Sequence, residues 1–456
     1  MVEGTSITAR LEADSNAARE ANDLAAANRE ASRHYADFGG AFHLLKFDRK
    51  GEAKPNRLCN FIAEIEREVV KSDGLATSRY FVVSGRLETG EPLPTVDVPA
   101  SEFDRLEWLP PSWGASAQIT VGSRFRDHVV AAIKERSDPE IVQLCQHTGW
   151  TQFNDELLYL TDSGGIGLEG LNPDASCELQ GPLADFNLPE PVDPRTLDLE
   201  AVLEAFRDLQ KDGTALVLLG AAMRAALCHF QPATCSVYLQ GTTGTFKSAA
   251  AGVLQGFWGP KFDGASLPAN WSSTANALEK TAFLAKDCLL VVDDFVARGT
   301  RQEVAYLHRK AEGLFRAQGN QSGRSRLTAK LEVRNAFHPR GMILATGEDV
   351  PNGQSLQARL VIVNVARGAI DTSVLSQLQK LARSGHLATI MASFVQWLAA
   401  EAKEDKLTEF IEMALECDHK NICSGGHART QDNLANLLTG LRIFLDFAED
   451  AGVMNS

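Results

Sequence analysis

The chain has 456 residues, of which 44% are hydrophobic and 23% are charged, a composition typical of a globular protein of two or three domains. The formal net charge of −14 excludes a protein that binds nucleic acid over its whole surface, but it is compatible with a local basic site. No apolar run approaches the roughly 18 residues of a transmembrane helix, and the N-terminal residues lack the pattern of a secretory signal. Eight cysteines without a C-x-x-C pair are typical of reduced thiols, so we expect a cytoplasmic protein with no membrane partner.

The first part of the chain predicts a segment and a domain without recognisable chemistry. Residues 1–36 are rich in Ala, Glu, Asn and Arg and are predicted to form an exposed helix or linker. Residues 37–190 mix strand-like runs, such as "RYFVVSGR" at 79–86, with short helical runs, such as "FRDHVVAAIKERS" at 125–137. This mixture predicts an α+β domain, and the proline-containing stretch at 186–196 predicts the linker that follows it.

Residues 191–370 show a different pattern, in which short apolar runs alternate with helical stretches. This alternation predicts a buried parallel sheet wrapped by helices. The predicted strands are "CSVYLQ" (235–240), "CLLVVDDF" (288–295), "GMILATGE" (341–348) and "LVIVNV" (360–365). Residues 371–456 are predicted to be all-helical, and the abrupt end after an amphipathic helix is typical of a truncated chain.

The loop "GTTGTFKS" nearly matches the phosphate-binding pattern G-x-x-x-x-G-K-[ST]. It follows an apolar strand and precedes an Ala-rich helix, so its N–H groups and the helix N-terminus are expected to face phosphate. Lys247 is expected to reach the β and γ phosphates of ATP, and Ser248 to offer its hydroxyl to Mg²⁺. The candidate nucleotide contacts are Gly241, Thr242, Thr243, Gly244, Thr245, Phe246, Lys247 and Ser248.

Phe246 is the departure from this pattern, because glycine usually precedes the lysine. An ordinary strand-to-helix turn is the alternative interpretation of the loop taken alone. The remaining motifs favour a nucleotide site, so the question is how the backbone at Phe246 adopts the loop conformation without the freedom of glycine.

A second motif, "LLVVDDF", ends a predicted buried strand with Asp293 and Asp294. Two carboxylates at such a position lose hydration unless they meet a cation or hydrogen-bond donors, although a capped strand end is the alternative. We expect Asp293 to hold Mg²⁺. Asp294 takes the place where P-loop ATPases usually have a glutamate that polarises the attacking water, and its side chain is one methylene shorter. Thr346 ends the strand "GMILAT", where its hydroxyl can orient that water.

The order of "GTTGTFKS", "DDF", "QGN…GRSR", "ATGE" and "ARL" resembles the helicase-like ATPases of phages, plasmids and other mobile elements, which are similar to superfamily 3 and MCM-type AAA+ helicases. The resemblance covers about residues 40–450, includes "HTGW" (147–150) and "WSSTANALEK" (271–280), and is strongest over 236–366. It implies an α/β P-loop core of the AAA+-like kind, with an α+β N-terminal domain and an all-helical C-terminal lid. It also implies a homo-hexameric ring that hydrolyses ATP with Mg²⁺ and moves on DNA.

The resemblance also implies roles for several basic residues. Arg359 corresponds to the arginine that reaches the γ-phosphate held by a neighbouring subunit. Arg429 is a candidate second sensor of nucleotide. Residues 298–340 contain ten Lys or Arg and three acidic residues, a local charge of +7. Within this segment the resembling helicases carry a pore hairpin, which would place Arg324, Arg326 and Lys330 on the DNA backbone; a solvated charged loop and a subunit interface are the alternatives.

A cluster near the C-terminus contains the ligand types of a zinc site. Cys417, His419, Cys423 and His427 follow the spacing C-x-H-x₃-C-x₃-H, which is not a common finger spacing. A loop between lid helices is the alternative, and the sequence does not decide between them.

The sequence leaves three functional hypotheses in competition. The first is a ring-forming, ATP-dependent DNA helicase or translocase that acts in the replication of a mobile element or phage. The second is an ATPase that does not translocate DNA, such as a remodelling AAA+ protein or a P-loop kinase. The third is a nucleotide-binding scaffold with little turnover, which the departures at Phe246 and Asp294 suggest.

Overall fold

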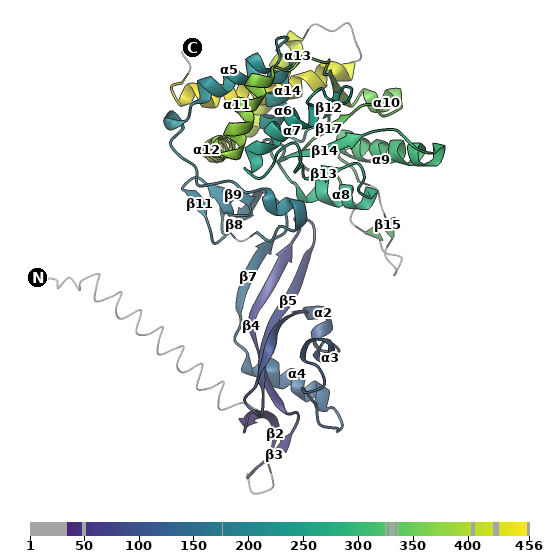
Figure 1. Ribbon diagram of the computed structural model, residues 1–456. Coiled ribbons are helices and arrows are strands. Elements are labelled where there is room, and N and C mark those ends of the chain that lie inside the picture. The colour runs from purple at the N-terminus through teal and green to yellow at the C-terminus, as the bar shows by residue number, and fades with distance from the viewer. Residues whose placement is uncertain are drawn as a thin grey trace, which may run out of the picture. The chain divides into compact units, whose positions relative to one another are not determined.

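The computed structural model describes residues 34–47, 52–175, 177–323, 326–327, 333–334, 337–402, 406–422 and 428–453 (Figure 1). The chain divides into two compact units, one of residues 1–71 and 77–143 and one of residues 72–76 and 144–456. The predicted domain 37–190 therefore spans both units, and its residues 144–190 belong to the larger one. No helix among the described residues combines the length and apolar character that a membrane span requires.

The smaller unit contains two sheets that pack against short helices. Its strands form a three-stranded antiparallel sheet in the order β1-β2-β3 and a four-stranded sheet in the order β6-β5-β4-β7. Phe61 and Trp113 pack edge to face in its core, with ring centroids 5.6 Å apart. The elements are β1 (Tyr35–Phe38), β2 (Ala41–Phe47), β3 (Ala53–Arg57), β4 (Phe61–Ser72), β5 (Thr77–Leu87), β6 (Pro92–Pro99), α2 (Ala100–Phe103), α3 (Leu109–Trp113), α4 (Phe125–Arg136) and β7 (Glu140–Cys145).

The larger unit combines a small antiparallel sheet with a five-stranded parallel sheet. The antiparallel sheet has the order β11-β10-β9-β8, and the parallel sheet has the order β13-β14-β17-β12-β18. The strands are β8 (Gly149–Phe153), β9 (Glu156–Thr161), β10 (Gly164–Gly167), β11 (Gly170–Asn172), β12 (Ser236–Gln240), β13 (Ala269–Asn270), β14 (Leu289–Phe295), β17 (Met342–Gly347) and β18 (Leu360–Asn364).

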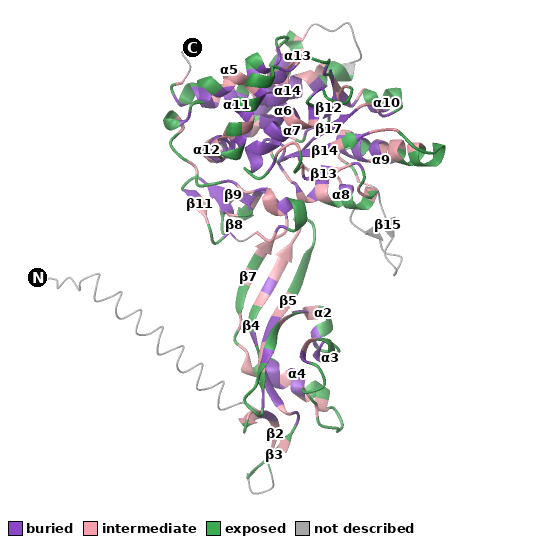
Figure 2. Cartoon of the chain, in the orientation of Figure 1, coloured by how far each residue is buried: buried purple, intermediate pink, exposed green. Residues whose placement is uncertain are grey.

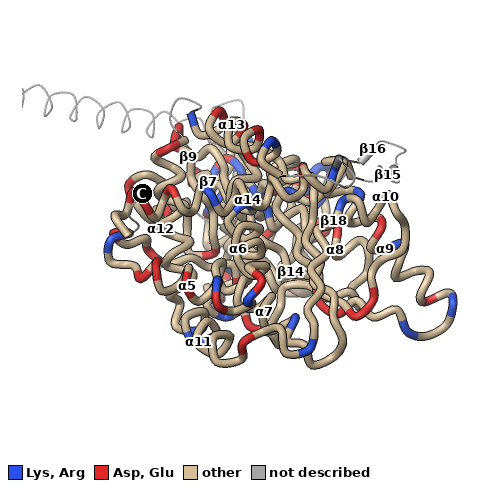
Figure 3. The backbone as a smooth tube through the Cα atoms, turned by 90° about the horizontal axis from the view of Figure 1, so that it is seen from above, with Lys and Arg blue, Asp and Glu red and all other residues tan. Residues whose placement is uncertain are grey.

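Helices surround the parallel sheet, and α6, α7 and α9 contact its strands. Side chains cap the first turns of α5, α8, α9 and α11, and at α9 the Thr300 and Glu303 side chains form a reciprocal capping box. The helices are α5 (Leu199–Leu209), α6 (Thr214–Ala225), α7 (Lys247–Gln255), α8 (Ala275–Leu284), α9 (Arg301–Asn320), α10 (Gln354–Gln357), α11 (Thr372–Arg383), α12 (His386–Glu401), α13 (Lys406–Asn421) and α14 (Ala428–Asp450). Acidic and basic residues are interspersed along them (Figure 3).

The buried residues concentrate in the parallel sheet and in the helices beside it (Figure 2). Residues 289–292 of β14 are all buried, as the continuous apolar run predicts for a strand covered on both faces. Leu218 of α6, Val237 of β12 and Trp150 of β8 belong to the same hydrophobic core. The predicted mixed α/β fold with a buried parallel sheet is therefore confirmed.

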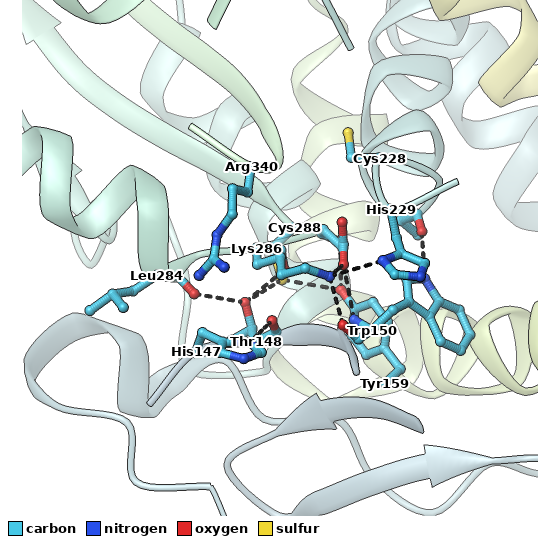
Figure 4. A network of polar contacts seen from close by, with 12 residues as sticks. His147, Thr148, Trp150, Tyr159, Cys228, His229, Leu284, Lys286, Cys288 and Arg340 are labelled. Carbon is cyan, nitrogen blue, oxygen red and sulfur yellow. Dashed lines mark hydrogen bonds and ion pairs between the residues drawn. The ribbon is translucent and has the colours of Figure 1, made fainter. Parts of the chain in front are cut away.

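The motif "HTGW" packs against the loop that enters β14 (Figure 4). The Thr148 hydroxyl donates hydrogen bonds to the carbonyl oxygens of Leu284 (3.3 Å) and Lys286 (2.8 Å). The backbone N–H of Trp150 donates to Asp287 Oδ2 at 2.9 Å. The motif thus anchors the antiparallel sheet to the strand that ends in the two candidate catalytic carboxylates.

Substitution of Gly149 by alanine is expected to lower the free energy of unfolding by about 3 kcal/mol. Gly149 has φ +83°, and an added Cβ would lie 2.4 Å from the Lys286 carbonyl oxygen and 2.6 Å from Asp287 Oδ2. Gly213→Ala is the matched control, because Gly213 has φ +77° and open space around its Cβ position. Urea unfolding measures both variants, and equal losses of stability would contradict the close packing.

The buried side chain of His147 is expected to lower the free energy of unfolding in mild acid. Burial is the main reason that the pKa of His147 drops from 6.5 to about 4, and the charges of Arg340 and Lys286 lower it further. The unfolded chain therefore binds a proton that the folded chain excludes, so stability is lost as the pH falls from about 6.5 toward 4. This residue is expected to contribute a loss of about 2 kcal/mol between pH 7 and pH 5, and urea unfolding of His147→Gln should lack that part of the pH dependence.

Candidate nucleotide site

The carboxyl ends of β12, β14 and β17 lie side by side at one edge of the parallel sheet, because β17 pairs in parallel with both other strands. A pocket of about 300 Å³ opens at this edge and is lined by the loop after β12 and by residues at the ends of β14 and β17. Ligands of open α/β sheets bind at such an edge, beyond the carboxyl ends of the strands. The predicted loop and both predicted strand-end motifs therefore surround one pocket.

Lys247 opens α7 and is 9% exposed. Its Nζ donates to the carbonyl oxygen of Thr242 at 3.0 Å and lies 3.4 Å from Thr245 Oγ1. Burial lowers the pKa of Lys247 and outweighs the opposite effect of nearby carboxylates, of which Glu348 contributes most. The ammonium group is thus enclosed by the loop at the N-terminus of a helix, where anions are favoured.

Phe246 adopts the left-handed conformation, with φ 64° and ψ 21°. Gly244 is also left-handed, with φ 83°. For a non-glycine residue this conformation costs roughly 1–2 kcal/mol, so the loop takes its shape at Phe246 with some strain. The Phe246 side chain is half exposed and lines the pocket, so the ring does not pack beneath the loop.

Asp293 links the loop to the two strands. Its Oδ1 accepts a hydrogen bond from Ser248 Oγ at 2.8 Å and another from the Thr346 hydroxyl. The same Thr346 oxygen accepts the backbone N–H of Asp294 at 3.2 Å. A carboxylate and a serine hydroxyl in contact are hard oxygen ligands, so the residues present fit Mg²⁺ with a nucleotide phosphate.

Asp294 lies in an irregularity of β14, where the register against β17 shifts between Val292 and Phe295. It has φ 68° and an exposed side chain that lines the pocket. Bulges of this kind redirect a side chain beside an active site. The two aspartates therefore have different surroundings: Asp294 lines the pocket and is open to solvent, whereas Asp293 contacts the hydroxyl groups of two residues that line it.

Glu348 is a pocket residue to which the sequence analysis assigned no role. Its Oε1 accepts a hydrogen bond from the Thr243 hydroxyl, and its Oε2 pairs with Arg298 Nη2 at 2.6 Å. The Thr243 hydrogen bond is the main cause of the lowered pKa of Glu348, and the charges of Arg298 and Lys247 add to it. Its position directly after the strand that carries Thr346 was the available signal.

Arg359 and Arg429 are not among the residues that line the nucleotide pocket. Arg359 is 7% exposed, and its guanidinium donates to Ser355 Oγ at 3.0 Å and to Asn320 Oδ1 at 2.8 Å. Burial is the main reason that the pKa of Arg359 is lowered, and the charges of Arg429 and Arg316 contribute. Three arginines are therefore close enough to interact, and Arg429 itself is exposed.

The predicted DNA contacts lie mostly outside the described residues. Arg324 and Lys330 are not among them, and Arg326 is described only as part of β15 (Arg326–Leu327), which pairs antiparallel with β16 (Val333–Arg334).

Two of the four residues of the predicted zinc site, Cys423 and His427, also lie outside the described residues. Within the described part of the chain, no group of three or more His, Cys, Asp or Glu side chains is arranged to hold a metal ion. His419 pairs instead with Asp432 at 3.1 Å.

The family described as "Domain of unknown function (DUF927)" matches residues 207–330, which include the loop and the two aspartates. The match covers less than half of the chain. No curated protein matches the sequence.

Several solved structures are similar to parts of the chain of different length. The structure of SCCmec type IV Cch, described as an active helicase, is 13% identical, covers 93% of this chain and 75% of its own, and has a TM-score of 0.53. The C-terminal region of NrS-1 is 8% identical, covers 83% and 87%, and has a TM-score of 0.34. The JCV helicase is 14% identical, covers 48% and 71%, and has a TM-score of 0.23. At 13% identity the first likeness shows a shared fold, whereas the TM-scores of the other two structures lie below 0.5.

Proposed function

We propose that the chain is a ring-forming, ATP-dependent DNA helicase or translocase that acts in the replication of a mobile element or phage. The observation that carries this proposal is one pocket on the carboxyl edge of the parallel sheet, which Lys247, Ser248 and Thr346 line, with Asp293 in contact with the last two. These groups supply an ammonium for phosphate, two oxygen ligands for Mg²⁺ and a hydroxyl beside them. The fold shared with a helicase supports the choice of an AAA+-like ATPase.

The catalytic roles follow from the surroundings of each group. Lys247 would bind phosphate oxygens, and Ser248 and Asp293 would hold Mg²⁺, which supplies positive charge beside the phosphates when it is bound. Asp294 is exposed to the pocket and polarises the attacking water. Thr346 orients that water, and its hydrogen bonds to both aspartates hold them in register.

The distribution of charge along the chain supports DNA as a partner. The segment 298–340 carries a local charge of +7 in a chain of −14, and phosphate contacts of this kind make binding dependent on salt. Arg324, Arg326 and Lys330 are the proposed DNA contacts. Arg359 is proposed to face the nucleotide of a neighbouring subunit in a hexamer, and Arg429 is proposed to act as a second sensor of nucleotide.

An ATPase that does not translocate DNA is the second candidate. The burial of Arg359 and its hydrogen bonds to Ser355 and Asn320 favour it, because an arginine held in this way has to be released before it can reach a neighbour.

The experiment is the rate of ATP hydrolysis with and without single-stranded DNA, together with the mass of the assembly in solution. The proposal predicts stimulation by DNA and a hexamer. Mixing Lys247→Ala with Arg359→Ala subunits should restore part of the activity if one subunit supplies the arginine to another. The second candidate would be favoured if DNA does not change the rate of hydrolysis and the chain stays monomeric at every concentration.

A further inference from the structure

Glu348 has both of its carboxylate oxygens engaged at the mouth of the nucleotide pocket. Oε1 accepts from the Thr243 hydroxyl of the loop, and Oε2 pairs with Arg298 Nη2 at 2.6 Å. A protein carboxylate therefore contacts the loop that is expected to receive phosphate. A carboxylate and a phosphate oxygen attract the same donors, so the two compete for this hydroxyl.

The lysine of the loop is also engaged within the protein. Lys247 Nζ donates to the carbonyl oxygen of Thr242 at 3.0 Å. The loop thus satisfies its lysine with its own backbone and its Thr243 hydroxyl with Glu348. A phosphate group that binds the Thr243 hydroxyl has to replace Glu348, whereas the lysine ammonium has three N–H donors and can also bind phosphate beside its Thr242 contact.

The Glu348 side chain can move away from the Thr243 hydroxyl while β17 stays in place. The backbone N–H of Glu348 donates to the Phe295 carbonyl at 3.1 Å, and the N–H of Gly241 donates to the Gly347 carbonyl at 3.2 Å. The Glu348 side chain, by contrast, is 22% exposed. Rotation about its side-chain bonds therefore releases the Thr243 hydroxyl without disturbing β17.

We propose that Glu348 is a phosphate-sensing positioning residue, whose carboxylate holds Thr243 of the loop until a nucleotide polyphosphate displaces it. This inference rests on the proposed function, because it assumes that the pocket receives a nucleotide. Glu348 and Lys247 line the same pocket, so a polyphosphate bound to that lysine would be repelled by the Glu348 carboxylate. The displaced carboxylate keeps Arg298 as a partner, and Arg298 lies three residues before α9 begins. Movement of the Glu348 carboxylate therefore transmits to α9 the signal that phosphate has bound in the pocket.

The test compares the affinity of Glu348→Gln and wild type for a fluorescent, non-hydrolysable ATP analogue and for fluorescent AMP. Removal of the charge is expected to tighten binding of the triphosphate by about three- to tenfold and to leave AMP binding unchanged. Thr243→Val removes the other partner and is expected to tighten triphosphate binding less, because it also removes a donor to phosphate. The double variant should bind no better than Glu348→Gln. Glu416→Gln on α13 is the matched control for loss of an exposed, paired glutamate.

The outcomes separate this inference from the proposed function. Equal or weaker binding by Glu348→Gln overturns the inference, and so does lost turnover with unchanged affinity, which would make Glu348 a group that acts on the reaction itself. Absence of triphosphate binding by wild type overturns the proposed function and the inference together. Thermal unfolding of each variant shows whether an affinity change reflects the site or a misfolded chain.

Discussion

Substitution of Lys247 by alanine is expected to lower the affinity for ATP and the rate of hydrolysis by on the order of 10²-fold or more. The Lys247 ammonium is buried at the start of α7 and is held by the loop, so its loss removes the cation nearest the expected phosphates. Equilibrium binding of a fluorescent ATP analogue and phosphate release measure the two effects. No compensating cation lies among the described residues that line the pocket.

The matched control for this substitution is Lys261→Ala. Lys261 is exposed and pairs with Asp185 at 3.1 Å, so its removal changes the net charge equally without touching the pocket. Exposed pairs of this kind contribute little to stability, and the control is expected to bind and hydrolyse ATP as wild type does. Normal hydrolysis by Lys247→Ala would exclude this pocket as the site of ATP turnover.

Substitution of Asp293 by asparagine is expected to lower turnover by on the order of 10²–10³-fold and to abolish the effect of Mg²⁺ on nucleotide affinity. The amide keeps the shape of the side chain but loses the charge that Ser248 and Thr346 both contact. Nucleotide binding measured with Mg²⁺ and with excess chelator checks this expectation. The two affinities should become equal in the variant.

Asp294→Asn is the companion variant, because the adjacent carboxylate occupies the same pocket with a different task. It should keep the Mg²⁺-dependent affinity and lose turnover, since Asp294 is proposed to act on water rather than on the metal. If Asp294→Asn hydrolyses ATP at the wild-type rate, the roles assigned to the two aspartates are wrong. If both variants keep Mg²⁺-dependent binding, the metal is held elsewhere.

Much of the larger unit could be predicted from the order of residues. The runs around Leu239, Val291 and Leu344 are short and continuously apolar, which is what burial on both faces of a parallel sheet demands. Parallel strands share a carboxyl edge, so polar residues that end such runs are brought together by the topology itself. This is why Lys247, Ser248 and Asp293 could be assigned to one site before the hydrogen bond between Ser248 and Asp293 was known.

The parallel sheet, the loop and the residues at the strand ends could be predicted from the order of residues, because these features depend on local periodicity and on one geometric property of parallel strands. Tertiary structure alone decided that residues 144–190 join the larger unit, that Phe246 takes a left-handed backbone with an exposed ring, and that Arg359 is buried against Asn320. It also revealed Glu348, whose partners Thr243 and Arg298 lie 105 and 50 residues away. Such contacts follow from packing between distant segments, and no local pattern in the chain encodes them.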